Sequence, residues 1–467
     1  MASKHDQLQA YQFSAQRVTS ALVTRETDPE QPPFRRPGNA VFGSIAIAVI
    51  ALAGAGIYGI INPGGNKGWQ DGKSVIVEKE TGTRYVYLDQ RLHPVMNYAS
   101  ALLAMDEHAP TLSVSRDSLT GVPRGPRIGI PDAPDALPDK DGLLTGGWTL
   151  CSQPTADEAG AVKPTSALMV GQQAPGGAEL GDRAVLADVP ETGARYLVHR
   201  GYRHLVDKAD VPAVGVALGA TPAIQVAPAV VEAIPQGAPV APIPVADIGK
   251  PAGIGSFLAG QLLAVRTSGG VQHYLAEKGR LRPITELQYD IQRAHQATAA
   301  AYPGAEPKAL PIGLIEAGNA PQTPVVPPKA GDPPTVRPEF APGGDAATLC
   351  LTFGAGTGVP TVTLDPPMPK ADPLTSTPKR TDRGAVLADR VLVPAGQAAL
   401  VEAVATPDAP RGTVIVVTDQ GIAYPLADPK VVEVLGFAGV QPVRMPAGLV
   451  ARIPSGSGLG HDAALRR

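Results

Sequence analysis

The chain has 467 residues, a formal net charge of -3 and 43% hydrophobic residues, so it is long enough for several packed domains and gives no electrostatic case for a nucleic-acid partner. Its 50 prolines, 52 glycines and 4% aromatic residues favour short strands, turns and ordered coil over long soluble helices.

The N-terminal segment is expected to hold one amphipathic helix. Its apolar residues step by three and four along a single face, at Leu8, Tyr11, Ala15, Val18 and Leu22. Because no domain adjoins this face in the sequence, we predict that it docks a protein partner; the alternative is the inner membrane surface.

The next segment, Val41 to Ile61, predicts a transmembrane helix. It has no charged residue and, at about 1.5 Å per residue, spans about 31 Å, the thickness of a hydrocarbon core. Arg35 and Arg36 precede it and only Lys67 follows closely, so the positive-inside rule places the N-terminus in the cytoplasm. The bulk of the chain is then periplasmic, anchored to the plasma membrane by a single pass.

Two other interpretations of this segment are a cleaved signal peptide and the buried helix of a soluble protein. Ala51-Leu52-Ala53 has the form of a cleavage site, but the apolar run continues beyond it and a long segment precedes it. So long an uncharged apolar run is also uncommon in soluble cores.

Beyond the membrane, a short apolar run followed by a Gly-x-x-Tyr turn recurs four times. We expect each glycine to take the positive φ of a β-hairpin turn, with a small helix after the hairpin. Such a unit buries little surface alone, so four copies imply packing on one another or on a shared centre. The turn positions are Gly82 and Tyr85, Gly193 and Tyr196, Gly270 and His273, and Gly421 and Tyr424, with histidine replacing tyrosine in the third copy.

The chain has two cysteines, Cys151 and Cys350, and the predicted topology places both outside the cytoplasm. An oxidising compartment favours a disulfide between them, and two buried free thiols are the alternative. We infer a discontinuous central β-rich domain with the repeats around it.

The predicted fold is therefore α+β, mostly β outside the membrane. Its expected division is 1–40, cytoplasmic segment; 41–62, transmembrane helix; 66–121, repeat 1; 122–180, first central part; 181–222, repeat 2; 223–253, Pro/Ala-rich connection; 254–299, repeat 3; 300–407, second central part; 408–453, repeat 4; and 454–467, flexible tail.

Motifs for catalysis or metal binding are weak. Gly72-Lys73-Ser74 lacks the earlier glycine of a P-loop and precedes a predicted strand instead of a helix. His199 and His204 have no third ligand at metal spacing. We name no catalytic, cofactor-binding or metal residue, although an active site assembled from distant residues would leave no such motif.

Four features of the sequence resemble the EccB family, a core membrane component of the type VII (ESX) secretion systems of actinobacteria. They are the opening His5-Asp6-Gln7-Leu8-Gln9-Ala10-Tyr11-Gln12-Phe13, the single apolar helix after Arg35-Arg36-Pro37, Gly68-Trp69 beyond it, and Cys151-Ser152. The similarity runs over essentially the whole chain. Ile453-Pro454-Ser455-Gly456-Ser457 partly matches the Leu-Pro-x-Gly-Pro stretch that ends the last repeat in this family.

The resemblance implies a cytoplasmic helix, one membrane pass, and four periplasmic repeat domains around a central domain with a disulfide. The implied partners are an EccC-like ATPase, EccD-like and EccE-like membrane subunits, and further copies of the chain. Weak ATP hydrolysis is ascribed to some members, but no catalytic residue carries over. We therefore expect a structural subunit of a secretion complex; the alternatives are a membrane-anchored periplasmic hydrolase and a cell-wall binding module.

Overall fold

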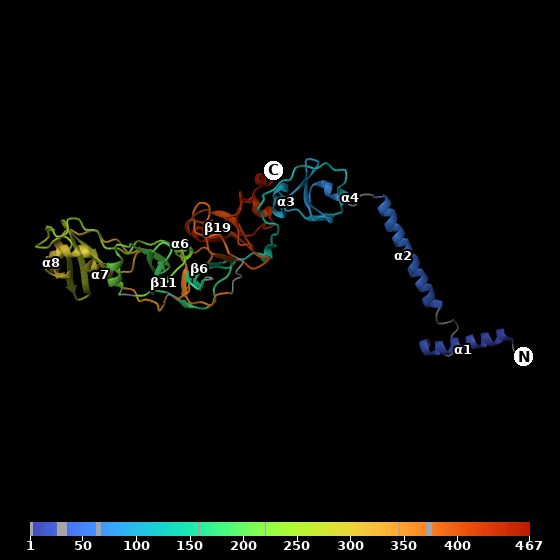
Figure 1. Cartoon of the computed structure of the whole chain (residues 1–467), viewed down its shortest axis with the longest axis horizontal. Coiled ribbons are helices and arrows are strands. Elements are labelled where there is room, and N and C mark those ends of the chain that lie inside the picture. Colours follow the sequence, from blue (N-terminus) through green and yellow to red (C-terminus); the bar gives the residue numbers. More distant parts are fainter. Residues whose placement is uncertain are drawn as a thin grey trace. The chain divides into compact units, whose positions relative to one another are not determined.

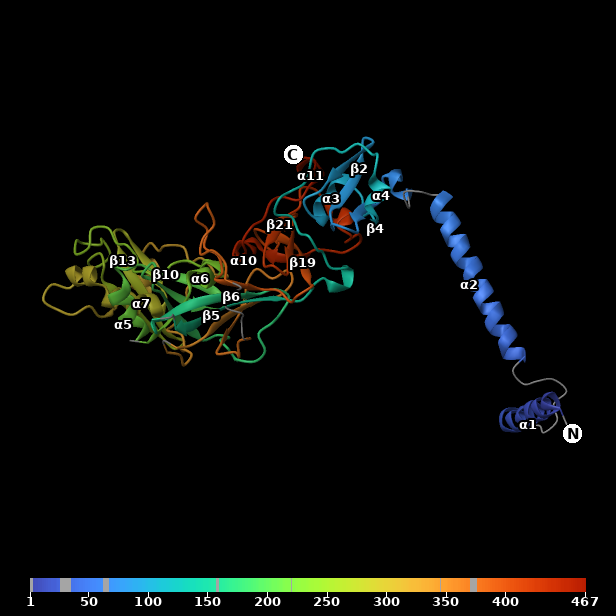
Figure 2. The same cartoon turned by 45° about the vertical axis from the view of Figure 1, so that its right-hand side comes forward.

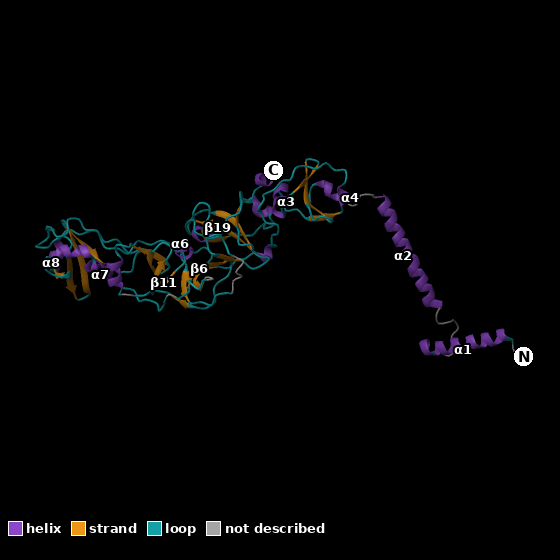
Figure 3. Cartoon of the chain, viewed as in Figure 1, coloured by secondary structure: helices purple, strands orange, loops and turns teal. Residues whose placement is uncertain are grey.

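The structure is a computed structural model that describes residues 3–25, 35–61, 67–156, 159–219, 221–344, 346–369 and 376–467. Its contacts divide the chain into two compact units. The first comprises Met1–Leu92 and Pro110–Gly125, and the second comprises His93–Ala109 and Pro126–Arg467. Beyond the two N-terminal helices, the described residues form short strands, loops and a few short helices (Figure 3), which confirms the expected α+β class.

The first unit begins with two helices, α1 (Lys4–Thr24) and α2 (Arg35–Ile61), which are labelled in Figure 1. A capping box starts α1: the Ser3 side chain accepts from the Asp6 backbone N–H, and the Asp6 carboxylate accepts from the Ser3 backbone N–H. The apolar helix starts at Arg35, six residues before the predicted start, and ends at Ile61. Residue 62 lies outside the described residues.

A four-stranded sheet follows, with strand order β3-β2-β1-β4. Its core is built on Trp69 from the 3-10 helix η1 (Gly68–Asp71), which is fully buried and donates from its indole Nε1 to the Ser118 hydroxyl. The strands are β1 (Val75–Glu78), β2 (Arg84–Leu88), β3 (Arg91–Pro94) and β4 (Thr111–Val114), and the short helix α4 (Arg116–Leu119) comes after them.

Three sheets of the second unit have the same strand order as the first sheet. In each, two antiparallel hairpins join the first three strands, and the fourth strand returns to lie parallel to the first. The three sets are β8 (Ala184–Val189), β9 (Ala194–His199), β10 (Tyr202–Val206) and β11 (Ala223–Gln225); β12 (Leu262–Thr267), β13 (Gly270–Glu277), β14 (Arg280–Ile284) and β15 (Leu310–Pro311); and β19 (Ala398–Val404), β20 (Thr413–Thr418), β21 (Ala423–Pro425) and β22 (Val443–Pro446).

One helix precedes and another follows the fourth strand of each set. The preceding helices are α3 (Tyr98–Met105), α5 (Val211–Leu218), α7 (Glu286–Ala294) and α9 (Lys430–Val434). The following ones, besides α4, are α6 (Pro228–Ala233), α8 (Leu314–Asn319) and α10 (Ala447–Val450). Further short helices are η2 (Lys140–Gly142), η3 (Gln296–Ala301) and α11 (His461–Ala464).

A short closing segment ends each of the four sets in the same way. Its middle residue forms an isolated parallel bridge to the third strand, and the two flanking residues complete the hydrogen bonds. The bridges are Leu92 to Arg124, Arg203 to Gln236, Leu281 to Gln322 and Ala423 to Ser455. In every case proline comes directly before the bridging residue, and glycine follows it in three of the four: Pro123-Arg124-Gly125, Pro235-Gln236-Gly237, Pro321-Gln322-Thr323 and Pro454-Ser455-Gly456.

A six-stranded sheet lies apart from these sets in the topology, with the order β18-β6-β5-β16-β17-β7. Strands β5 and β6 form a long hairpin, visible in Figure 2. Its strands come from two separated stretches of sequence: β5 (Trp148–Ala156), β6 (Val162–Met169) and β7 (Ala178–Glu179), and then β16 (Leu349–Phe353), β17 (Thr361–Leu364) and β18 (Arg390–Leu392).

The six-stranded sheet shares one continuous hydrophobic core with the second and fourth sets. Trp148 and Phe353 of this sheet pack in the same buried cluster as Val185 from β8 and Val401 from β19. The opposite face of the second set packs against α7 through Leu287. The set built on β12 has a core of its own.

The structure differs from the expected division at four places. Strands β11 and β15 lie in segments expected to be connection and central domain, because each pairs in parallel with the first strand of its set. The fourth set starts at β19, before the predicted boundary at residue 408. The predicted flexible tail is ordered: Leu459 and Ala464 are fully buried, and Leu459 donates its N–H to the Pro425 carbonyl.

Candidate functional site

The predicted docking face on α1 is exposed along its length. Leu8, Tyr11, Val18 and Leu22 are 53%, 73%, 59% and 80% exposed, and nothing in the described chain covers them. Phe13 is also 58% exposed, but at 3.6 residues per turn it lies about 140° around the helix from Leu8. The sequence analysis missed this second apolar position, so the helix offers apolar contacts on more than one side.

Helix α2 is the described helix that is long and apolar enough to span a membrane. The stretch Asn39–Tyr58 has a mean hydropathy of 2.3 and is not buried against the rest of the chain. Its large side chains, such as Phe42 and Leu52, are 76% and 73% exposed. A core helix of a soluble protein would bury them, so this interpretation is excluded.

Cys151 and Cys350 form a disulfide, as predicted. They lie directly opposite each other on the adjacent antiparallel strands β5 and β16, with their Cα atoms 4.0 Å apart. Both are fully buried, and 199 positions separate them in the sequence. The bond therefore joins the two sequence stretches that build the six-stranded sheet.

The four predicted turn glycines all have positive φ, but they do not occupy equivalent turns. Gly82 and Gly193, with φ of 71° and 63°, lie between the first and second strands of their sets, and Gly270, with φ of 125°, is the first residue of the second strand β13. Gly421, with φ of 70°, lies between β20 and β21, the second and third strands. The prediction for the fourth copy was thus displaced by one strand, and Tyr424 is not equivalent to the earlier tyrosines.

The third copy was also displaced, by one residue. Tyr196 pairs with Leu205 across β9 and β10, and at the same nine-residue separation Tyr274 pairs with Pro283 across β13 and β14. The equivalent residue is therefore Tyr274. His273 instead stacks on the Tyr289 ring, with centroids 4.2 Å apart.

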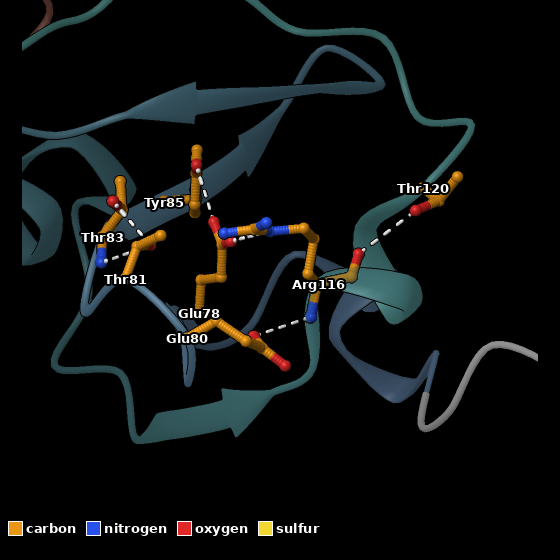
Figure 4. Close-up of polar contacts among 7 residues, drawn as sticks. All are labelled: Glu78, Glu80, Thr81, Thr83, Tyr85, Arg116 and Thr120. Atoms are coloured by element: carbon orange, nitrogen blue, oxygen red, sulfur yellow. Dashed lines mark hydrogen bonds and ion pairs between the residues drawn. The ribbon is translucent and has the colours of Figure 1, made fainter.

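Tyr85 belongs to a polar cluster on the two central strands of the first sheet, β1 and β2 (Figure 4). Its hydroxyl donates to the Glu78 carboxylate at 3.1 Å, and Arg116 Nε donates to the other oxygen at 2.8 Å. The bond from Arg116 lowers the pKa of Glu78 despite its burial. Glu80 accepts from the Arg116 backbone N–H. Both oxygens of the Glu78 carboxylate are engaged, so the cluster fastens α4 to β1.

The later tyrosines also have structural partners. The Arg203 guanidinium lies over the Tyr196 ring at 5.5 Å. The Tyr424 hydroxyl donates to the Asp132 carbonyl at 2.8 Å, and burial raises the pKa of Tyr424 to about 12. With so high a pKa, Tyr424 is not suited to proton transfer near neutral pH.

The weak motifs have structural explanations as well. Gly72 ends η1, and Lys73 and Ser74 lead directly into β1, so the helix N-terminus that a P-loop uses is missing at this position. His204 is buried, and its Nδ1 lies 2.7 Å from the Ala238 carbonyl oxygen. Among the described residues, no group of histidine, cysteine, aspartate and glutamate side chains is arranged to hold a metal ion.

The sequence analysis did not find the closing segments. Each of them has a Pro-x-Gly or Pro-x-Thr pattern. In three sets the middle residue of this pattern follows the third-strand residue that it bridges by 32 or 33 positions; these middle residues are Arg124, Gln236 and Ser455. A search for a repeated Pro-x-Gly would have detected it. The partial match noted at the C-terminal end is thus one of four instances.

Known proteins are similar to this chain in sequence and in fold. The family model described as type VII secretion system ESX-1, transport TM domain B, matches residues 1–467. The ESX-1 secretion system ATPase EccB1 of Mycolicibacterium smegmatis is 26% identical over 98% of this chain and 94% of its own length. The ESX-3 secretion system ATPase EccB3 of Mycobacterium tuberculosis is 28% identical over 98% of this chain and 88% of its own length.

Two solved structures show the same fold. A chain of the intact ESX-5 inner membrane complex aligns with a TM-score of 0.61 and 22% identity, covering all of this chain and 95% of that one. The EccB3 dimer from the ESX-3 core complex aligns with a TM-score of 0.58 and 22% identity, covering 84% and 100%. The chain therefore belongs to the EccB family, the transport TM domain B of type VII secretion systems.

Proposed function

We propose that this chain is a structural core subunit of a type VII secretion membrane complex. The observation that carries the proposal is the family match over residues 1–467, which includes the apolar helix and every strand set. Solved relatives of the same fold come from an ESX-5 inner membrane complex and from an EccB3 dimer. Self-association and membership of a membrane complex are therefore the expected behaviour of this chain.

Helix α2 anchors the subunit in the inner membrane in a single pass. Arg35 and Arg36 at its N-terminal end favour a cytoplasmic α1 and a periplasmic remainder under the positive-inside rule. A disulfide between Cys151 and Cys350 agrees with an oxidising compartment for that remainder. The exposed apolar face of α1 docks a cytoplasmic or membrane partner, for which EccC-like, EccD-like and EccE-like subunits are the candidates.

The periplasmic part comprises four repeats and one disulfide-linked sheet. Strand pairing supports limits for the four repeats near 75–125, 184–237, 262–323 and 398–456. Each repeat starts at its first paired strand and ends at its closing segment. In the expected division, all four repeats end earlier, at residues 121, 222, 299 and 453.

An architectural role suits the chemistry of the described residues better than an enzymatic one. The two relatives compared in sequence carry the word ATPase in their names, but Gly72-Lys73-Ser74 precedes a strand here. The strongest polar cluster, around Glu78, is saturated by Arg116 and Tyr85. We assign no residue to nucleotide hydrolysis.

The docking role of α1 is tested with Leu8→Asp combined with Val18→Asp in the full-length chain. Two charges on the exposed apolar face should strongly reduce co-purification of the other membrane subunits in native detergent, while the amount of chain in the membrane stays constant. Gln9→Asp combined with Gln16→Asp adds the same charge on the other side of the helix and serves as the control. Equal recovery of partners from both variants would place the main contact elsewhere.

A further inference from the structure

A pocket of about 420 Å³ lies within the second unit, among segments that are distant in sequence. One wall comes from Arg203 on β10 and the end of α6, another from the loop 356–359 between β16 and β17, and a third from the end of β19 with β22. This volume is in the range that proteins use for small ligands. Gly201 packs closely on the loop, since a Cβ there would lie 2.5 Å from Val359 Cγ1.

Three charged side chains line the pocket, and two of them are already neutralised. Glu232 accepts from Arg452 Nη1 at 2.6 Å. Arg444 Nε lies 3.4 Å from the Glu402 carboxylate, and Arg444 Nη2 donates to the Ala409 carbonyl. The third charged side chain of the lining is Arg203.

Arg203 has no acidic partner in the described part of the chain. Its side chain is half-buried, its guanidinium lies over the Tyr196 ring, and its Nε is buried without a hydrogen-bond partner. A buried donor without a partner costs free energy, more so when it belongs to a charged group. The pocket is thus lined by a guanidinium whose charge no acidic side chain of the described chain balances.

The rest of the lining narrows the class of anion. Val359, which is 39% exposed, contributes apolar surface, and Pro235, Pro407 and Pro446 also belong to the lining. The planar guanidinium matches the two oxygens of a carboxylate, which it binds with two parallel hydrogen bonds. We propose that this pocket binds a carboxylate that carries an apolar substituent, such as the free C-terminal end of a short peptide, with Arg203 as its charge partner.

A ligand in this position would contact the second set, the fourth set and the six-stranded sheet at once. Because it binds only when the three walls are in place, it should stabilise their arrangement and raise the melting temperature. The proposal concerns a ligand site and does not depend on the chain's role in secretion.

The test uses the full-length chain in detergent and isothermal titration calorimetry. The probe is the peptide Ala-Ala-Leu with a free carboxylate, compared with the same peptide as its C-terminal amide, with acetate and with inorganic phosphate. We expect the free acid to bind, the amide to bind at least about tenfold more weakly, and acetate and phosphate to bind more weakly than the acid.

Arg203→Gln should weaken binding of the free acid by about 10- to 100-fold. The matched control is Arg200→Gln. Arg200 lies two residues before the start of β10 and outside the pocket, where it is exposed and pairs with Asp182. Val359→Trp fills the pocket from the opposite wall without touching the charge, so it should also abolish binding and remains informative if Arg203→Gln fails to fold.

Three results would overturn the proposal. The first is no binding of the free acid at millimolar concentration, and the second is equal affinity for the acid and the amide. The third is unchanged affinity in Arg203→Gln or in Val359→Trp, since an anion bound elsewhere would not respond to either substitution.

Discussion

Replacing both cysteines, Cys151→Ala with Cys350→Ala, removes the covalent link between β5 and β16. The pairing of these strands from Trp148 to Ser152 survives, because it depends on backbone hydrogen bonds and on a buried hydrophobic core. The double substitution therefore lowers the free energy of unfolding mainly through the unfolded state, which gains conformational entropy when the loop of 199 residues is no longer closed. On the chain-entropy model this corresponds to about 5 kcal/mol of unfolding free energy.

Trp148 gives a local readout of this change. It is fully buried in β5, three residues from the disulfide, and the chain has 2 tryptophans. In a Trp69→Phe background, its fluorescence follows urea unfolding of the six-stranded sheet. With a urea dependence of about 2 kcal/mol per molar, the midpoint should fall by about 2.5 M.

Trp69 provides the control, since it reports on the core of the first unit in a Trp148→Phe background and should show an unchanged midpoint. The reasoning is wrong if the Trp148 midpoint is the same with and without the cysteines. It is also wrong if alkylation of the denatured, unreduced protein labels two thiols.

Three further predictions concern other contacts. Gly456→Ala should lower the melting temperature by several degrees, because a Cβ there would lie 2.3 Å from a ring carbon of the neighbouring tyrosine, whereas Gly458→Ala, with its nearest atom at 3.9 Å, should be neutral in the same thermal scan. Burial lowers the pKa of His204 below 6.5, so its contribution to stability is complete above pH 6.5 and is lost as the pH falls toward the folded-state pKa. The free energy of unfolding, measured at several pH values, should therefore vary less with pH in His204→Gln than in the unchanged chain. An identical pH dependence in both would contradict this. Glu232→Ala should cost about 2 kcal/mol in denaturant titrations, because it leaves the charge of Arg452, whose side chain is 8% exposed, without its carboxylate partner; an unchanged free energy of unfolding would contradict this.

The sequence predicted the features that depend on local composition or on the compartment. Helix α2 follows from an uncharged apolar run, and the disulfide from two cysteines in an oxidising compartment. The positive φ at the turn glycines follows from the residue type.

The one-residue error in the third repeat has a physical cause, which is the variable length of the first turn. Five residues separate β1 from β2, four separate β8 from β9, and two separate β12 from β13, so counting from the first-turn glycine slips by a residue at His273. The second turns of these sets each have two residues, at 89–90, 200–201 and 278–279, and counting back from them identifies Tyr274. Two-residue turns match the twist of the paired strands and therefore keep the register.

The long-range features needed the structure. The parallel return of β22 to β19 joins segments about 40 residues apart, and no local pattern encodes such a pairing. The same holds for Arg203, whose lack of an acidic partner depends on which side chains gather around it. The C-terminal segment was predicted to be a flexible tail because it is rich in glycine and serine. Its single leucine before α11, Leu459, is fully buried and holds the segment on the fold.

The central claim is that this chain is a structural subunit of a membrane complex. Its most direct test is affinity purification of the full-length chain from its own membranes in native detergent, followed by mass determination of the particle and identification of its components. The account predicts a particle with several copies of this chain, an EccC-like ATPase and a polytopic membrane subunit. Recovery of the chain as a monomer without partners would contradict it.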